Sequence, residues 1–190
     1  MKKKQFLLAF AFLLLIGAQI SCQKNPKEDY HILIPGVGYD NYKIGVTTLE
    51  DIIKTNGNSY RLDTFYRKTD KNSPDYVNEK GEIYSIAACY DSLGVRFFFY
   101  PNEKNIFSIV LRPPFKGITK EGIKLNESNF NDLVKCYGDS PWGFGPGRMS
   151  MGYGGIWFTQ KSNYTFESTD KEKNTCLYNK ITEITIANPD

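Results

Sequence analysis

Two short segments of the chain carry the same pattern of apolar and polar positions. In residues 47–57, TTLEDIIKTNG, the apolar side chains Leu49, Ile52 and Ile53 recur at the spacing that lines one side of a helix. Residues 128–138, SNFNDLVKCYG, carry an apolar stripe of the same kind and also end in glycine. Each segment therefore predicts a short helix that stops at its glycine and needs a partner surface for its stripe.

Polar residues in and around the two segments also correspond. Thr47 and Glu50 have the spacing of a capping box, and Ser128 can cap the second helix. Three polar pairs match at a separation of 81 positions: Asp51 with Asp132, Lys54 with Lys135, and Ser59 with Ser140. The matches predict that the chain consists of two homologous halves. The alternative is two unrelated amphipathic helices in one α+β domain.

Segments rich in β-branched and aromatic residues follow each helix and predict strands. They are residues 85–90, 94–100 and 105–111 after the first helix, and residues 154–160, 163–168 and 180–186 after the second. A short extended segment precedes each helix, at residues 42–45 and 122–125. We therefore predict an α+β fold of two tandem repeats, each a short helix packed on a three- to four-stranded antiparallel sheet.

The predicted boundaries divide the chain into four parts. Residues 1–21 form a lipoprotein signal peptide, and residues 22–30 form a lipidated cysteine with its tether. Residues 31–115 form the first repeat unit and residues 116–190 the second, packed together as one compact body. The join is RPPFKG at residues 112–117, where two prolines exclude a helix.

The amino-terminal segment has the features of an export signal. Three lysines precede an uncharged run from Phe6 to Ala18, which is too short to span a membrane, and Cys22 follows shortly after. The segment resembles a bacterial lipoprotein signal, in which the cysteine after the cleavage site is acylated. The resemblance implies Cys22 as the lipidation site and a lipid anchor in the bacterial cell envelope, expected in the outer membrane. The alternative is an ordinary cleaved signal that releases the protein.

The charge balance changes once the signal is set aside. The whole chain has 24 Lys plus Arg and 21 Asp plus Glu; residues 1–22 hold three lysines and no acidic residue, which leaves 24 − 3 = 21 basic residues. The rest of the chain is near-neutral and has no basic cluster, which predicts no nucleic-acid partner.

Three other cysteines follow the signal: Cys89, Cys136 and Cys176. At most one internal disulfide can form among them, and their spacing matches no zinc motif.

The sequence predicts no catalytic residue, no metal site and no cofactor. Its single histidine, His31, lies in an extended segment and is expected to be structural or solvent-facing. The glycines of residues 143–148, GFGPGR, lack the strand before and the helix after that a dinucleotide fingerprint requires. A hydrolase with a carboxylate pair stays open as an alternative, because carboxylates are plentiful.

The most unusual segment is SPWGFGPGRMSMGYGGIWF, residues 140–158. Its first part is too rich in glycine to predict regular structure, and its Trp, Tyr and Arg residues are types that dominate protein-binding hot spots. We therefore predict a loop whose partner-binding residues are Trp142, Phe144, Arg148 and Tyr153. The alternative is that Trp142 and Phe144 fold back into the core. Trp157 lies in a predicted strand and is expected in the core.

The charged residues 66–82 form a second unusual segment and are expected to form a solvated loop.

The predicted arrangement, a helix ending in glycine followed by an antiparallel sheet and repeated once, resembles the β-lactamase inhibitor protein fold. It also resembles the single-unit outer-membrane assembly lipoproteins of the SmpA/OmlA (BamE-like) type. Both groups imply protein binding rather than catalysis. The expected function is thus a non-catalytic envelope lipoprotein that holds an unknown protein partner as an inhibitor, an immunity protein or an assembly accessory. The alternatives are the carboxylate hydrolase and a small-molecule-binding lipoprotein.

Overall fold

The computed structural model describes residues 29–66, 82–140, 142–145, 147–161 and 176–189. Within these ranges the chain is an α+β protein, as predicted. Its elements are β1 (His31–Ile34), β2 (Gly38–Tyr39), β3 (Tyr42–Lys43), α2 (Leu49–Asn56), β4 (Arg61–Tyr66), β5 (Ile83–Tyr90), β6 (Val95–Phe99), β7 (Ile106–Leu111), β8 (Gly117–Thr119), α3 (Phe130–Tyr137), β9 (Trp142–Gly145), β10 (Arg148–Tyr153), β11 (Ile156–Lys161), the 3-10 helix η2 (Cys176–Tyr178) and β12 (Glu183–Ala187).

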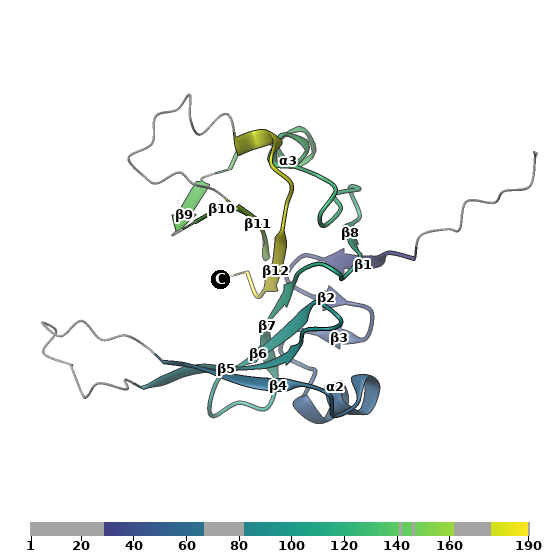
Figure 1. Ribbon diagram of the computed structural model, residues 1–190, viewed down its shortest axis with the longest axis vertical. Coiled ribbons are helices and arrows are strands. Elements are labelled where there is room, and N and C mark those ends of the chain that lie inside the picture. Colours follow the sequence, from purple (N-terminus) through teal and green to yellow (C-terminus); the bar gives the residue numbers. More distant parts are fainter. Residues whose placement is uncertain (1–28, 67–81, 141, 146, 162–175, 190) are drawn as a thin grey trace, which may run out of the picture.

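The strands form two sheets. The large sheet has eight strands in the order β4-β5-β6-β7-β12-β11-β10-β9, all antiparallel, and the small sheet has the order β3-β2-β1-β8. In the small sheet β8 runs parallel to β1. Figure 1 shows the large sheet as an open curve, with β4–β5 and β9–β10 extending to the same side of the central strands. Both helices and the small sheet lie on the other side of the large sheet.

One hydrophobic core joins the layers. It lies between the large sheet, the small sheet and the two helices, and its members include Leu33, Ile52, Phe97, Phe130 and Phe158, all buried. Each helix is only eight residues long and gains its stability from this packing, because a helix so short is marginal alone.

Each helix begins with a capping box and ends before a glycine. Thr48 pairs with Asp51 at the start of α2, and Asn129 pairs with Asp132 at the start of α3. In each box the first side chain accepts a hydrogen bond from the backbone N–H three residues later, and the acidic side chain accepts one from the cap backbone. The predicted ends at Gly57 and Gly138 are confirmed, with φ of 79° and 81°.

The predicted caps at Thr47, with Glu50 as its partner, and at Ser128 are wrong by one residue. Both hydroxyls are engaged in the turn before the helix instead. Thr47 Oγ1 accepts a hydrogen bond from the Lys43 backbone N–H at 2.8 Å, and Ser128 Oγ accepts one from the Lys124 backbone N–H at 3.0 Å. The next residue in each segment therefore takes the capping position.

The strand predictions are confirmed for β5, β6, β7, β11 and β12. The prediction of irregular structure after residue 140 is wrong, because Trp142–Gly145 and Arg148–Tyr153 form the antiparallel pair β9–β10. β4 was not predicted, and residues 122–125 contribute a single bridge from Lys124 to Ile118 rather than a strand. The predicted strand at 163–168 and most of the loop at 66–82 lie outside the described residues.

The first half, residues 31–115, and the second half, residues 116–190, make corresponding contacts. In each half a helix precedes four antiparallel strands, and the last strands, β7 and β12, pair at the centre of the large sheet. Val110 lies opposite Thr185 in that central pair. Three backbone hydrogen bonds of the first half have counterparts in the second: Gly45 N to Ile106 O with Asn126 N to Ile181 O, Ile106 N to Thr47 O with Ile181 N to Ser128 O, and Arg112 N to Gly94 O with Ala187 N to Gly155 O.

Candidate functional site

The face of the large sheet that points away from the helices is not covered by any described element (Figure 1). Side chains alternate between the two faces of a strand. In β6, Val95, Phe97 and Phe99 belong to the buried core, so Arg96 and Phe98 point to the uncovered side. We call this uncovered surface of the large sheet the open face.

Cross-strand pairing brings residues of both halves into one row on the open face. The row crosses seven strands in the order of the sheet: Arg61, Cys89, Arg96, Val110, Thr185, Trp157 and Gly152. Cys89, Val110 and Thr185 are small or medium side chains, and Cys89 and Val110 are buried. The larger side chains of the row are Arg61 and Arg96 in the first half and Trp157 in the second.

Trp157 lies on the open face, with 37% of its surface exposed. The prediction that it belongs to the core is wrong, because its neighbours Ile156 and Phe158 take the core positions of β11. Its indole lies over Gly152 of β10, where an added Cβ would come within 2.6 Å of the indole Nε1. A tryptophan resting on a cross-strand glycine is held in place while its outer surface stays available to a partner.

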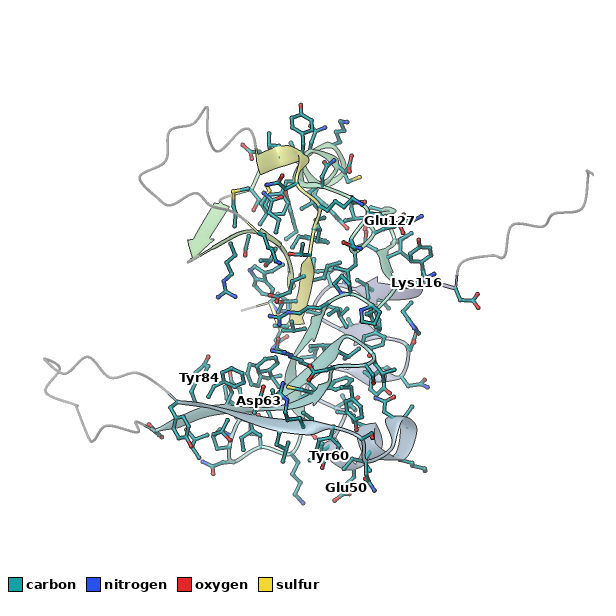
Figure 2. All side chains as sticks on the ribbon, viewed as in Figure 1. Glu50, Tyr60, Asp63, Tyr84, Lys116 and Glu127 are labelled. Carbon is teal, nitrogen blue, oxygen red and sulfur yellow. The ribbon has the colours of Figure 1, made fainter. Side chains whose placement is uncertain are left out.

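A chain of aromatic rings extends along the opposite end of the open face. Ring centroids are 5.6 Å apart for Phe65 and Phe98, 6.3 Å for Phe98 and Phe107, and 4.0 Å for Phe107 and Tyr100. Tyr84 meets Tyr100 edge-on at 6.4 Å, and Figure 2 shows Tyr84 on the inner side of the curve. Phe65, Tyr84 and Tyr100 are all exposed large side chains.

The charges between these aromatic ends are arranged in ion pairs. Arg61 hydrogen-bonds Asp63 and lies 3.2 Å from Asp91, and Arg96 lies 3.5 Å from the same Asp91 carboxylate. The hydrogen bond from Arg61 is the main reason that the pKa of Asp91 is lowered from its ordinary value. Asp91 is therefore ionised at neutral pH and is poorly suited to act as a general acid.

Arg112, just after β7, reaches Glu183 of β12 at 2.5 Å across the central strand pair. Arg148 and Lys161, at the far end of β10 and β11, are different. They lie directly opposite each other in the register, both are exposed, and neither has an ion-pair partner among the described residues. Directly opposed like charges destabilise a strand pair, so this end of the face favours a ligand that brings negative charge.

The predicted partner-binding residues of 140–158 separate between the two faces. Arg148 lies on the open face, whereas Tyr153 lies on the core face, where its hydroxyl donates to Gly138 O at 2.9 Å and its ring stacks on Tyr137. For Trp142 and Phe144 the structure gives the backbone register alone, opposite Met151 and Met149. Their role in binding stays a prediction, as does lipidation of Cys22, which lies outside the described residues.

The remaining candidate groups lie elsewhere. His31 is on the small sheet, half-exposed, with Nδ1 at 2.5 Å from Asp40 Oδ2. Cys89 and Cys136 are free cysteines, and burial raises the pKa of the Cys89 thiol. Among the described residues no cluster of three or more His, Cys, Asp or Glu side chains could hold a metal ion.

Sequence reasoning missed Arg96, Phe98 and the exposed position of Trp157. Their places on the open face follow from strand alternation once the core residues are known.

In the described part of the chain, none of the helices has the length and apolar character to cross a bilayer. The chain matches no family model, no curated protein and no solved structure.

Proposed function

We propose that this protein is a non-catalytic, lipid-anchored protein of the bacterial cell envelope that binds a protein partner on the open face. The observation that carries the proposal is the combination, on one uncovered sheet face, of exposed aromatic rings with the opposed cations Arg148 and Lys161. Aromatic and arginine side chains supply most of the binding energy at protein interfaces. The partner is accordingly a protein that presents carboxylates beside apolar side chains.

The electrostatics of the open face favour this reading over a hydrolase. Three carboxylates on it are engaged with arginines: Asp63 and Asp91 with Arg61, and Glu183 with Arg112. Of these carboxylates, Asp91 has a pKa lowered chiefly by its hydrogen bond from Arg61, so it stays ionised and cannot easily supply a proton.

We further propose that the two halves are tandem repeats derived from one unit of a helix and four strands. The matching capping boxes, the matching glycines after the helices and the three pairs of equivalent backbone hydrogen bonds support this. In this proposal the central pairing of β7 with β12 fuses two sheets into one, which doubles the width of the surface that a partner can contact.

The anchor rests on the amino-terminal sequence, with Cys22 as the lipidated residue and the outer membrane as the location. Metabolic labelling with a fatty-acid probe is expected to label the full chain and to fail with Cys22→Ala, because only an acylated cysteine carries the probe. A Cys22→Ser variant, which also lacks the thiol at position 22, is expected to remain unlabelled as well. Cys136→Ala, which removes an exposed cysteine elsewhere, is the control and is expected to keep the label. Equal labelling of the wild type and Cys22→Ala would contradict the anchor.

A photo-crosslinking side chain at position 157, in the full chain in its own membrane, is expected to capture one protein partner. Reversing both charges, with Arg148→Glu and Lys161→Glu, is expected to reduce the captured amount by about tenfold or more, because like charges then face each other across the interface. The same crosslinker at Lys54, exposed on α2, is the matched control and should not capture that partner.

Mass spectrometry of the crosslinked segment adds the chemical test. The partner segment joined to position 157 is expected to lie beside Asp or Glu residues. Two results would contradict the proposal: capture of the same protein from Lys54 as from position 157, or capture that is unchanged by the charge reversal.

A further inference from the structure

A pocket lies on the other side of the molecule from the open face, between the small sheet, the end of α2 and the turn from β5 to β6. Its volume is about 490 Å³, within the range of about 300–1,000 Å³ for small-ligand sites. Figure 2 shows Lys116, one of its residues, on the small-sheet side, far from Tyr84. The pocket is therefore separate from the surface proposed to hold a protein.

The second half has a larger side chain at the matched last position of its helix. Asn56 is the last residue of α2, and Tyr137 is the last residue of α3. The Tyr137 ring stacks on Tyr153 at 4.9 Å, and its hydroxyl donates to Thr119 Oγ1 at 3.0 Å. Asn56 is shorter than Tyr137 at the matched last position of the helix, and Asn56 is one of the residues that line the pocket.

The polar groups of the pocket are held in fixed orientations. The Tyr42 hydroxyl donates to Asn56 Oδ1 at 2.8 Å, which leaves the Asn56 amide N–H groups as donors. His31 Nδ1 lies 2.5 Å from Asp40 Oδ2, and the imidazole stacks on the ring of Phe115 at 4.8 Å. Asp40 adopts φ of 46° in the two-residue turn between β2 and β3, a conformation that aspartate adopts in tight hairpin turns.

Apolar and uncharged polar groups together line the pocket. Leu93, Val95, Pro114 and Phe115 provide the apolar side, and Asn41, Thr55, Asn56 and Ser92 provide amides and hydroxyls. Burial raises the pKa of both Tyr39 and Tyr42, so their hydroxyls remain neutral at physiological pH. The site thus offers hydrogen-bond donors and acceptors in addition to a surface for C–H groups.

We propose that this pocket binds a neutral carbohydrate, one or two sugar rings in size. A sugar hydroxyl both donates and accepts, which suits neighbouring amides, hydroxyls and the Asp40 carboxylate, and the C–H face of a sugar ring suits the exposed side chain of Leu93. This inference is independent of the proposed protein partner, since it uses other residues on another face.

The charges and ring positions argue against other ligand classes. Among the described residues that line the pocket, Lys116 is the one lysine or arginine, and Asp29 and Asp40 are also in the lining, so an anion such as phosphate is disfavoured. Tyr39 and Phe115 are 4% and 9% exposed, so they cannot form the aromatic cage that holds an organic cation.

Saturation-transfer NMR tests the site on the full chain, kept in a detergent without a sugar headgroup. The probes are glucose, galactose, N-acetylglucosamine and their disaccharides at about 10 mM, above the millimolar Kd expected for a shallow neutral site. At least one sugar is expected to give a signal. Asn56→Tyr, which introduces the residue found in the second half, is expected to weaken binding by about tenfold or more.

Lys54→Tyr adds the same ring on the exposed side of α2 and should retain the signal, as should Trp157→Ala on the open face. Circular dichroism checks that Asn56→Tyr is folded, and Ser92→Trp, at an exposed turn, obstructs the pocket without altering the helix. The proposal would be overturned if no sugar gave a signal, if binding survived both obstructing variants, or if calorimetry found that inorganic phosphate or tetramethylammonium bound more tightly than every sugar.

Discussion

Phe97→Ala and Phe158→Ala are each expected to lower the free energy of unfolding by about 3–5 kcal/mol. Both rings are fully buried, at the core positions of β6 in the first half and of β11 in the second. Phe97 contacts Tyr42 at 4.9 Å between ring centroids, and Phe158 contacts Tyr137 at 6.1 Å. Removing either ring leaves a cavity in the core that the sheets and the helices share.

Phe98→Ala is the matched control, because it removes the same side chain from the next residue of β6. Phe98 is half-buried on the open face, so Phe98→Ala is expected to lower the free energy of unfolding by about 1–2 kcal/mol. Urea unfolding followed by circular dichroism gives all three values. A loss from Phe98→Ala as large as that from Phe97→Ala would mean that the open face is covered, and would remove the basis for a docking surface there.

The segment around these residues shows how much of the fold the sequence contained. GVRFFFY predicts a strand from its composition, and that prediction is confirmed as β6. Three consecutive phenylalanines cannot all face one side, so alternation assigns Phe97 and Phe99 to one face and Phe98 to the other. Knowing which face is covered required the position of the helices, which the strand alone does not contain.

The segment from 140 to 158 could not be predicted in the same way. Its glycines weaken strand propensity, and local preference indicated a loop. The strand β10 forms because Met149 and Met151 alternate into the core and because its backbone pairs with both β9 and β11. Pairing partners distant in the sequence overcome a weak local preference, and a single sequence does not show them.

The two candidate sites differ in how far they could be predicted from the sequence. The open face depends on the pairing of β7 with β12, a long-range arrangement that fixes which side chains share a surface. The pocket, in contrast, had a signal in the sequence, since the aligned helices end in Asn56 before Gly57 and in Tyr137 before Gly138. A difference in side-chain volume at one matched position is a signal that sequence comparison between the halves could have found.

Gly94→Ala and Gly155→Ala are each expected to cost about 2–5 kcal/mol, the sum of an unfavourable backbone angle and a steric clash. Gly94 has φ of 69° and Gly155 has φ of 89°, in the turns that lead into β6 and β11. A Cβ on Gly94 would lie 2.0 Å from the Arg112 backbone oxygen, and one on Gly155 would lie 2.9 Å from the Ala187 backbone oxygen.

Gly122→Ala separates the two contributions to this cost. Gly122 has φ of 91° and open space around the position of a Cβ, so it carries only the angular penalty of about 1–2 kcal/mol. Thermal and urea unfolding of the three variants are compared. If the two halves are copies of one unit, the loss of stability from Gly94→Ala and from Gly155→Ala should in both cases be larger than that from Gly122→Ala. The reason is that Gly94 O and Gly155 O accept hydrogen bonds from the backbone N–H groups of Arg112 and Ala187, which hold each glycine close to the carbonyl that an added Cβ would meet. A Gly94→Ala loss equal to that of Gly122→Ala would show that the close approach at Arg112 is relieved by a small shift, and the equivalence of the two turns would lose its energetic support.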